Sequence, residues 1–313
     1  MVAVDLFAGC GGLSLGLSNA KIDVVAAYEK WQPAIEVYKR NFDHPVHDFD
    51  LSNEVEAIEH IRQYKPDLIA GGPPCQDFSS AGKRNENGGR GNLTLSFAEI
   101  VINVLPEWFL MENVERISKS QIYKDAKQML SKASYGLTEM VIDASYCNVP
   151  QKRKRMFLIG KLCESTNFLK GFLEKRMSAK SMTVKDYFGD DLNIEFYYRH
   201  ARSYARRGVF SINEPSPTIR GVNRPIPPNY KFHEGDACRE KSKIRPLTTL
   251  ERAQIQTFPK GFKWHAGNKS LMEQLIGNAV PVNLAKFVGE AIVSYKSEDN
   301  WRLNFMNEAI ESF

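Results

Sequence analysis

The sequence lacks the features that mark membrane, secreted and metal-binding proteins. No apolar stretch approaches the roughly 18 residues of a membrane span. No basic region precedes the short apolar segment at the N-terminus, which argues against a signal peptide. The five cysteines are odd in number and form no C-x-x-C pair, so neither a disulfide framework nor a zinc site is expected. These absences favour a folded protein of the reducing cytoplasm, with no membrane partner and no bound metal.

Two common nucleotide-binding signatures are also missing. The segment DLFAGCGG is a glycine-rich turn, but the nicotinamide fingerprint G-x-G-x-x-G would need a glycine at Ser14, and no G-K-[ST] sequence follows to cradle the phosphates of ATP. A cofactor without a phosphate chain, such as S-adenosylmethionine, needs only an acid for its ribose, and Glu29 ends the next strand-like run. Asp48 or Asp50 is the candidate acceptor for the adenine amino group, although either residue fits a helix cap or a turn equally well.

Positive charge is concentrated in one segment of the chain. The net charge is +5, but Arg199–Arg245 holds eleven Lys and Arg residues against four Asp and Glu residues. The rest of the chain is therefore slightly acidic. Such a segment is the electrostatic footprint of a protein that binds a polyanion, although a solvated basic face would have the same composition.

Strand-like and helix-like segments alternate over about the first 160 residues. The expected strands are MVAVDLFAG, DVVAAYE, PDLIAGGPP, EWFLMENV, LTEMVIDA and KRMFLIGKL. The expected helices are GGLSLGLSNA, QPAIEVYKRNF, NEVEAIEHIRQY, LSFAEIVINVL and YKDAKQMLSKA. This alternation predicts an α/β fold with a doubly wound, mostly parallel sheet and helices on both faces. In such sheets, ligands bind at the carboxyl ends of the strands.

The pattern changes after the sixth expected strand. At 313 residues the chain exceeds the usual size of a single core. Residues 164–245 are rich in Arg, Asn, Pro and aromatic residues, and helical periodicity returns afterwards in LTTLERAQIQTF and LMEQLIGNAV. We therefore predict a large domain formed by residues 1–163 and 246–313, and a second, smaller domain formed by residues 164–245.

Chemically reactive side chains follow three of the expected strands. Cys75 comes directly after two prolines, which end a strand and hold the thiol in a rigid loop rather than in the core. Glu112 ends the next strand at the same edge. In QKRKR, strand alternation places Gln151, Arg153 and Arg155 on one face and the two lysines on the other. These strands predict a polar site that combines a thiol, a carboxylate and arginines.

In these motifs the sequence resembles the DNA cytosine-C5 methyltransferases, and the resemblance covers nearly the whole chain. DLFAGCGG resembles the family's cofactor loop, GGPPCQDFS its nucleophile loop, MENV its acid strand and QKRKR its arginine strand. LTTLERAQIQTFP and QLIGNAVPVNLA resemble its two closing motifs, and residues 164–245 occupy the place of its target-recognition domain. The resemblance implies an S-adenosylmethionine-dependent methyltransferase fold of Rossmann-like type.

The resemblance also assigns roles to individual residues. It implies that the catalytic residues are Cys75, Glu112, Arg153 and Arg155. It implies that S-adenosylmethionine contacts Phe7, Gly9, Gly11, Glu29, Asp50, Leu93, Asn278 and Ala279. Asp50 is preferred to Asp48 because Asp-Leu-Ser fits the family's acid-plus-aliphatic pattern. The implied DNA contacts are Gln76, Ser79, Arg206, Arg207, Thr218, Arg220 and Arg224, of which Thr218 resembles the first residue of the family's Thr-aliphatic doublet.

The activity implied is methylation of a cytosine at C5 in double-stranded DNA. Cys75 would attack C6, Glu112 would hydrogen-bond N3 and the amino group, and Arg153 would hold the base or the thiolate. The base must leave the stack first, at roughly a few kcal/mol. A monomer at the nucleoid, working beside a separate restriction endonuclease, fits this reading.

Three alternatives remain at this point. A transfer-RNA methyltransferase of the same family would use the same cysteine chemistry, although the basic segment and the compact chain favour DNA. A catalytically silent DNA-binding relative should have lost the nucleophile or the acid, yet both are present. A nicotinamide-dependent oxidoreductase is weakened by Ser14.

Overall fold

The fold is built around one large sheet. The computed structural model describes residues 1–74, 92–201, 206–265 and 267–311, with the backbone alone at 92 and from 300 onward. The seven strands lie in the order β3-β2-β1-β4-β5-β8-β6, and β8 runs antiparallel to both of its neighbours while the first five strands of that order are parallel. The strands are β1 Val2–Leu6, β2 Asp23–Glu29, β3 Val46–Asp48, β4 Leu68–Gly71, β5 Trp108–Val114, β6 Tyr135–Asp143 and β8 Lys154–Leu162.

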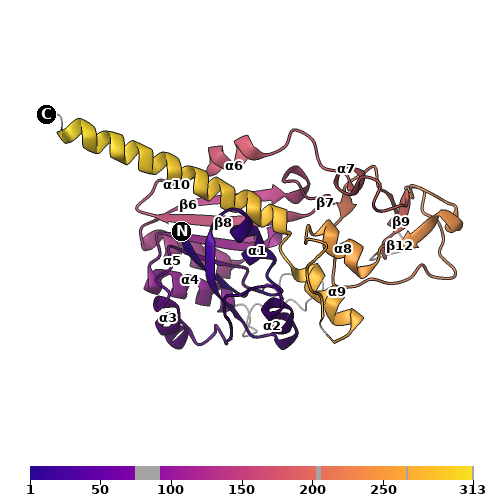
Figure 1. Ribbon diagram of the computed structural model, residues 1–313, viewed down its shortest axis with the longest axis horizontal. Coiled ribbons are helices and arrows are strands. Elements are labelled where there is room, and N and C mark those ends of the chain that lie inside the picture. Colours follow the sequence, from indigo (N-terminus) through magenta and orange to yellow (C-terminus); the bar gives the residue numbers. More distant parts are fainter. Residues whose placement is uncertain (75–91, 202–205, 266, 312–313) are drawn as a thin grey trace.

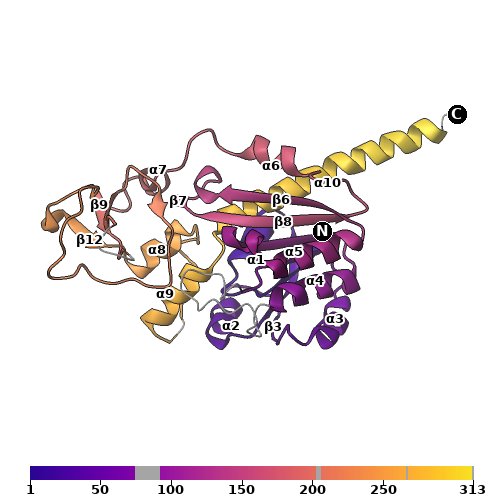
Figure 2. The ribbon, with the colours of Figure 1, turned by 180° about the vertical axis from the view of Figure 1, so that it is seen from behind.

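Helices cover both faces of this sheet (Figures 1 and 2). They are α1 Gly12–Asn19, α2 Gln32–Lys39, α3 Glu54–Arg62, α4 Asn92–Val104, α5 Gln121–Lys132, α6 Lys170–Arg176 and α10 Val282–Glu311. Short 3-10 turns follow β5 at Glu115–Lys119 and β6 at Ala144–Tyr146, and a third at Lys241–Lys243 precedes β12 of the smaller sheet. Alternate side chains of each strand enter opposite cores, as the twofold period of a strand requires. Leu68 and Ala70 pack with α1, α6 and α10, whereas Ile69 between them packs with α3, α4 and α5. The α/β fold with a mostly parallel sheet is confirmed.

A smaller sheet lies at the end of the molecule away from the tip of α10 (Figures 1 and 2). Its order is β10-β9-β12, and a further two-stranded pairing joins β11 to β7. The bounds of these strands are β7 Gln151–Lys152, β9 Phe196–Tyr198, β10 Val209–Ser211, β11 Ser216–Pro217 and β12 Ile244–Pro246. The helices of this region are α7 Val184–Phe188, α8 Thr249–Ile255 and α9 Lys269–Asn278.

The division of the chain at 163/164 and 245/246 stays a prediction. Within residues 164–245, Leu169 and Leu173 lie in the core beneath α10, whereas Tyr197 and Phe210 pack with residues of α8 and α9. The hydrophobic cores thus run across the expected boundaries.

The last helix, α10, packs along α1 and then continues beyond the sheet, so that its C-terminal part projects from the body (Figure 1). No helix in the described part of the chain has a stretch apolar and long enough to cross a membrane.

Candidate active site

The strand register brings the predicted cofactor and catalytic groups to one edge of the sheet. Leu6 pairs with both Tyr28 and Gly71, so the glycine loop after β1, the end of β2 and the loop after β4 leave the sheet at the same level. Gly71 in turn pairs with Met111, the residue before Glu112. Five parallel strands therefore deliver their carboxyl ends to one surface, as expected for a ligand site in this fold.

The glycine loop after β1 is held in an unusual backbone conformation. Phe7, Gly9 and Gly11 have φ values of 58°, 56° and 92°, and the left-handed region is strained for Phe7 because it carries a Cβ. A Cβ on Gly11 would lie 2.3 Å from the ring of Phe42, so this position has no room for a side chain. A Cβ on Gly9 would meet no atom within 4 Å. The loop is thus packed tightly on one side and open at Gly9.

Glu29 is fixed at the end of β2 by backbone donors. Its Oε2 accepts from the Gly9 N–H at 2.8 Å, and its Oε1 accepts from the N–H groups of Lys30 and Trp31, each at 2.8 Å. The carboxylate therefore lies against the glycine loop with a defined orientation. This arrangement suits recognition of a ribose, because a preoriented carboxylate can accept from two adjacent hydroxyls.

The two acids after β3 are both engaged by neighbours. Asp50 forms an ion pair with Lys30, and its Oδ1 accepts from the Ser52 N–H at 3.1 Å and from the Ser52 hydroxyl at 2.7 Å. The hydrogen bond from Lys30, and then those from Ser52, lower the pKa of Asp50 to about 2. Asp48 accepts from the side-chain amide of Gln32. The choice of Asp50 as the adenine contact stays a prediction.

The second closing motif lies against the glycine loop. A Cβ on Gly12 would be 2.3 Å from the carbonyl oxygen of Val280, so the turn after α9 touches the start of α1. In this turn Asn278 is exposed and Ala279 is buried. Leu93 is half-buried in the first turn of α4. The contact at Gly12 joins the first and the last of the family-like motifs, although Gly12 and Val280 are 268 positions apart in the sequence.

Glu112 is the carboxylate of the predicted catalytic group, and it is nearly buried. Arg155 Nε lies 2.9 Å from its Oε1, across the antiparallel pairing of β5 and β8. A Cβ on Gly72 would lie 3.2 Å from Glu112 Oε2, so the carboxylate rests on the backbone that leads into the GGPPCQ loop. The Asn113 side-chain amide donates to the Pro73 carbonyl at 3.0 Å and tethers that loop at its start. Cys75, Gln76 and Ser79 lie outside the described residues.

Removal from water raises the pKa of the Glu112 carboxyl group, and the charges of Arg155 and Arg153 offset part of that shift. Burial also lowers the pKa of the Arg155 guanidinium, which the charge of Glu112 opposes. A carboxyl group in this setting holds a proton to a higher pH than an exposed glutamate.

The two arginines of QKRKR have different surroundings. Arg153 is fully buried, and its Nη1 donates to the Ile219 carbonyl at 3.0 Å. Its Nη2 donates to the carbonyls of Gly277 and Ala279 at 3.1 and 3.0 Å. Arg155, in contrast, is the direct partner of Glu112. The expectation that Arg153 holds the base or the thiolate stays a prediction. In the structure its guanidinium joins the backbone at Ile219 to the backbone at the end of α9, and no sequence pattern indicated either contact.

Two glutamines extend this tie, and sequence reasoning missed one of them. Gln151 Oε1 accepts from the Ile219 N–H at 2.7 Å, and its Nε2 donates to Gln256 Oε1 at 2.7 Å. Gln256 Nε2 then donates to the carbonyls of Ile276 and Ala279 at 2.6 and 3.1 Å. The alternation in QKRKR pointed to Gln151, whereas nothing in LTTLERAQIQTF distinguished Gln256 from an ordinary helix residue.

The predicted DNA contacts within the described residues fall into two groups. Arg206 and Arg224 are exposed. Arg207 pairs with Glu214 and lies 4.2 Å from the ring centre of Phe210. Part of the predicted basic surface therefore braces the small sheet itself.

Thr218 and Arg220 also hold protein segments together. The Thr218 hydroxyl donates to the Lys152 carbonyl at 2.8 Å, and Arg220 Nη2 donates to the His200 carbonyl at 2.5 Å. The pKa of His200 is lowered by burial and by the charges of Arg224, Arg220 and Arg199. Positive charge is thus concentrated around His200, as a site for a polyanion requires.

Comparisons with known proteins agree with this architecture. Residues 1–294 match the model of the C-5 cytosine-specific DNA methylase family. The chain is 59% identical to the Type II methyltransferase M.HindV of Haemophilus influenzae over 95% of this chain and 98% of that protein. It is 54% identical to the Type II methyltransferase M.HgiDI of Herpetosiphon aurantiacus over 95% and 96%.

Solved structures show the same fold at lower identity. The S. pombe Dnmt2 methyltransferase matches with a TM-score of 0.68 and 20% identity, covering 96% of this chain and 99% of that one. A prophage-encoded protein of E. coli matches with a TM-score of 0.69 and 23% identity over 95% and 99%. The family match over nearly the whole chain, together with relatives above half identity, shows that this protein belongs to the C-5 cytosine-specific DNA methylase family.

Proposed function

We propose that this protein transfers a methyl group from S-adenosylmethionine to C5 of a cytosine in duplex DNA, with Cys75 as the nucleophile. Family membership and the names of the two Type II relatives support a DNA cytosine-C5 methyltransferase of restriction-modification type. In the cell, this activity would protect host DNA from a cognate restriction endonuclease that acts separately.

One observation carries the proposal: the Glu112–Arg155 pair lies directly beside the backbone that leads into the Cys75 loop. Because Gly72 has no side chain, the Glu112 carboxylate can lie against the backbone at that residue. The Asn113 side-chain amide donates to the Pro73 carbonyl and so fixes the start of the loop. A base held by Glu112 would therefore meet a nucleophile supplied by the next residues of the same loop. This pairing of a buried acid with a cysteine loop suits attack on a ring that must take up a proton.

The acid supports the reaction by holding a proton. C5 of cytosine is too weakly nucleophilic to take a methyl group, so the Cys75 thiolate first adds to C6. As the C6–S bond forms, ring electrons move toward N3, and Glu112 donates its proton there. The resulting enamine is nucleophilic at C5. After methylation, the C5 proton leaves to solvent and the C6–S bond breaks, which re-forms the C5–C6 double bond and returns the electron pair to Cys75 as the thiolate. N3 then gives its proton back to Glu112, so both the aromatic ring and the acid are restored.

The residues at the cofactor end fit S-adenosylmethionine. Gly9 leaves open space beside its backbone, and Glu29 presents a carboxylate oriented by three N–H groups. Asp50, Leu93 and Asn278 would complete the contacts. When bound, this cofactor supplies an electrophilic methyl group on a sulfonium.

The DNA end would rely on the basic segment. The cytosine must leave the duplex, at a cost of roughly a few kcal/mol, which contacts to the backbone and neighbouring bases must offset. The exposed Arg206 and Arg224 are the first candidates for these contacts. Phosphate contacts fix the register, and arginine contacts to guanine supply sequence information.

The test is methylation of a plasmid with S-adenosylmethionine, followed by mapping of 5-methylcytosine at base resolution. Wild-type protein should methylate one short sequence throughout the plasmid. Cys75→Ser should abolish transfer while cofactor and DNA binding persist, and Cys163→Ser serves as the matched control because Cys163 is an exposed free cysteine. Transfer to tRNA in place of duplex DNA, or substantial turnover by Cys75→Ser, would contradict the proposal.

A further inference from the structure

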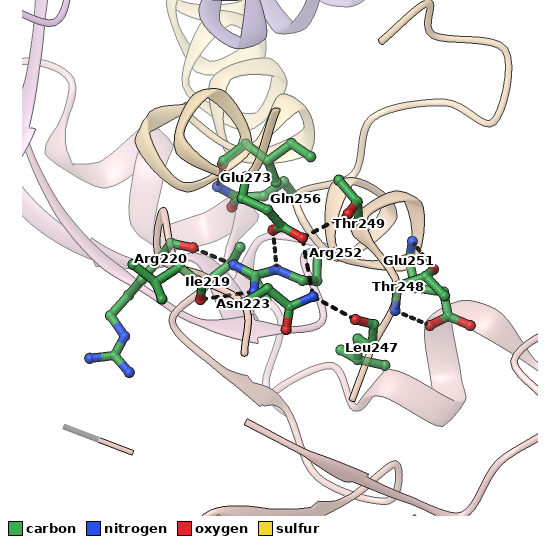
Figure 3. Close-up of polar contacts among 12 residues, drawn as sticks. Ile219, Arg220, Asn223, Leu247, Thr248, Thr249, Glu251, Arg252, Gln256 and Glu273 are labelled. Carbon is green, nitrogen blue, oxygen red and sulfur yellow. Dashed lines mark hydrogen bonds and ion pairs between the residues drawn. The ribbon is translucent and has the colours of Figure 1, made fainter. Parts of the chain in front are cut away.

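A buried ion pair joins α8 to α9, and the chemistry proposed above does not use it. Arg252 Nε lies 2.9 Å from Glu273 Oε2, and their side chains are only 6% and 3% exposed (Figure 3). Charges so deeply buried are stable only when paired and hydrogen-bonded. Burial lowers the pKa of Arg252, and the charge of Glu273 opposes that shift. The partners of the remaining polar atoms therefore show what the pair holds.

The guanidinium of Arg252 holds the backbone of the segment Arg220–Arg224, which we call the recognition turn. Its Nη1 donates to the Val222 carbonyl at 3.0 Å, and its Nη2 donates to the Arg220 carbonyl (Figure 3). One planar side chain thus fixes two carbonyls of the turn. The planar fork of arginine suits this double contact, which a lysine ammonium cannot reproduce in the same geometry.

The carboxylate of Glu273 holds the same turn through a side chain. Its Oε1 accepts from Asn223 Nδ2 at 3.1 Å and from the Thr249 hydroxyl at 2.7 Å. Asn223 Nδ2 also donates to the Leu247 carbonyl at 2.8 Å. Figure 3 shows these contacts converging on the ion pair from α8, α9 and the recognition turn. The two charges therefore anchor both the backbone and one side chain of this short segment.

Packing of the recognition turn on α9 gives independent support. A Cβ on Gly277 would lie 2.2 Å from the Gly221 nitrogen and 2.4 Å from the Arg220 carbonyl carbon. The turn thus lies directly on the helix backbone, where only glycine fits. With its backbone bound inward, the turn leaves Val222 50% exposed and Arg224 exposed.

We propose that Arg252 and Glu273 are positioning residues for DNA sequence recognition. They fix the recognition turn so that Arg224 and Val222 meet the DNA in one orientation, and this inference rests on the proposed function. Arginine reads guanine by two hydrogen bonds, and an apolar side chain reads the methyl group of thymine. Both contacts need the backbone within about 0.5 Å of its place.

The decisive variant is Arg252→Met/Glu273→Leu, which removes both charges and retains apolar volume. Replacing both partners leaves no unpaired charge in the core. The carbonyls of Arg220 and Val222 lose their donor, so activity is compared at a temperature at which the variant remains folded. The matched control is Arg245→Met/Glu251→Gln. That pair joins β12 to the first turn of α8 through contacts of 2.7 Å, and a glutamine in place of Glu251 would preserve the capping box with Thr248.

The readouts are the midpoint of urea unfolding, kcat, the KM for each substrate and base-resolution methylation. For Arg252→Met/Glu273→Leu we expect an unchanged KM for S-adenosylmethionine and a KM for DNA raised by about tenfold. Methylation of sites that differ from the preferred sequence by one base pair should rise by about tenfold. Both changes are on the scale of one lost base contact. Arg252→Lys should give a smaller change in the same direction. The control should retain wild-type discrimination.

Two results would overturn the inference. A folded double variant with wild-type KM for DNA and wild-type site discrimination would show that the pair does not position the turn. Loss of kcat with both KM values and the site preference unchanged would show a purely structural role. A wild type that transfers no methyl group to any duplex would be a different outcome, because it refutes the proposed function on which the inference rests.

Discussion

Replacement of Arg153 tests whether this arginine acts on the substrate or on the protein. In the structure its guanidinium donates to the carbonyls of Ile219, Gly277 and Ala279. Arg153→Ala removes these three donors from a fully buried site. If the contacts are structural, the main loss is in the free energy of unfolding, and reduced methyl transfer follows from it.

The size of the loss can be estimated from these contacts. A hydrogen bond to a charged group contributes about 1.5–3 kcal/mol. The Ala279 carbonyl keeps Gln256 as a donor, so two carbonyls lose the partner seen here. With the cavity left by the side chain, we expect about 3–5 kcal/mol of destabilisation. Arg153→Lys keeps the charge but loses the fork, and we expect about half of that effect.

Urea denaturation gives the midpoint and slope of unfolding for wild type, Arg153→Ala and Arg155→Ala. Methyl transfer is then measured for the same three proteins at a temperature at which all remain folded. Arg155→Ala is the comparison because Arg155 contacts Glu112 itself. We expect Arg155→Ala to lose activity while folded. If the free energy of unfolding of Arg153→Ala lies within about 0.5 kcal/mol of wild type, the scale of a surface change, and the variant still transfers no methyl group, the structural account of Arg153 is wrong.

Three further predictions follow from other contacts. Gly277→Ala should destabilise the fold by about 1–3 kcal/mol, because its Cβ would lie 2.2 Å from the Gly221 nitrogen, and urea unfolding measures the change. Burial raises the pKa of Asp5 to about 7, so the stability that its protonated form contributes should be lost as pH rises from about 4 to 7. Asp5→Asn should flatten that part of the profile of unfolding free energy against pH. An unchanged profile would count against the shift. DNA binding should weaken steeply between roughly 50 and 200 mM salt, and a flat titration by fluorescence anisotropy would contradict a phosphate-binding role for the basic segment.

The sheet and its helices could be predicted because local periodicity encodes them. Leu68, Ile69 and Ala70 are all apolar because both faces of β4 are covered, and the helical segments repeat their apolar residues on one side. The antiparallel direction of β8 has no such local signal, because a strand buried on both faces reads the same in either direction. The order of the strands likewise depends on crossovers that periodicity does not record.

The polar ties around the site could be predicted only in part. Alternation in QKRKR placed Gln151 and Arg153 on one face, but it did not predict that both side chains are buried. The hydrogen-bond partners of Arg153, however, lie 66 to 126 positions away in the sequence. A single sequence contains no signal that predicts contacts over such separations. The same holds for Arg252 and Glu273, which look like ordinary charged positions on two amphipathic helices until their shared burial is seen.

The arginine strand shows how one motif can serve both chemistry and architecture. Arg153 and Arg155 are two positions apart, and in one continuous strand their side chains would lie on the same face. The strand is broken at Arg153, however, which lies between β7 and β8. Beyond the interruption, Arg155 lies opposite β5 and meets Glu112. Before it, β7 pairs with β11, which brings Ile219 within reach of Arg153. The difference in role therefore arises from which sheet each half of the motif joins, and this can be seen only once both sheets are in place.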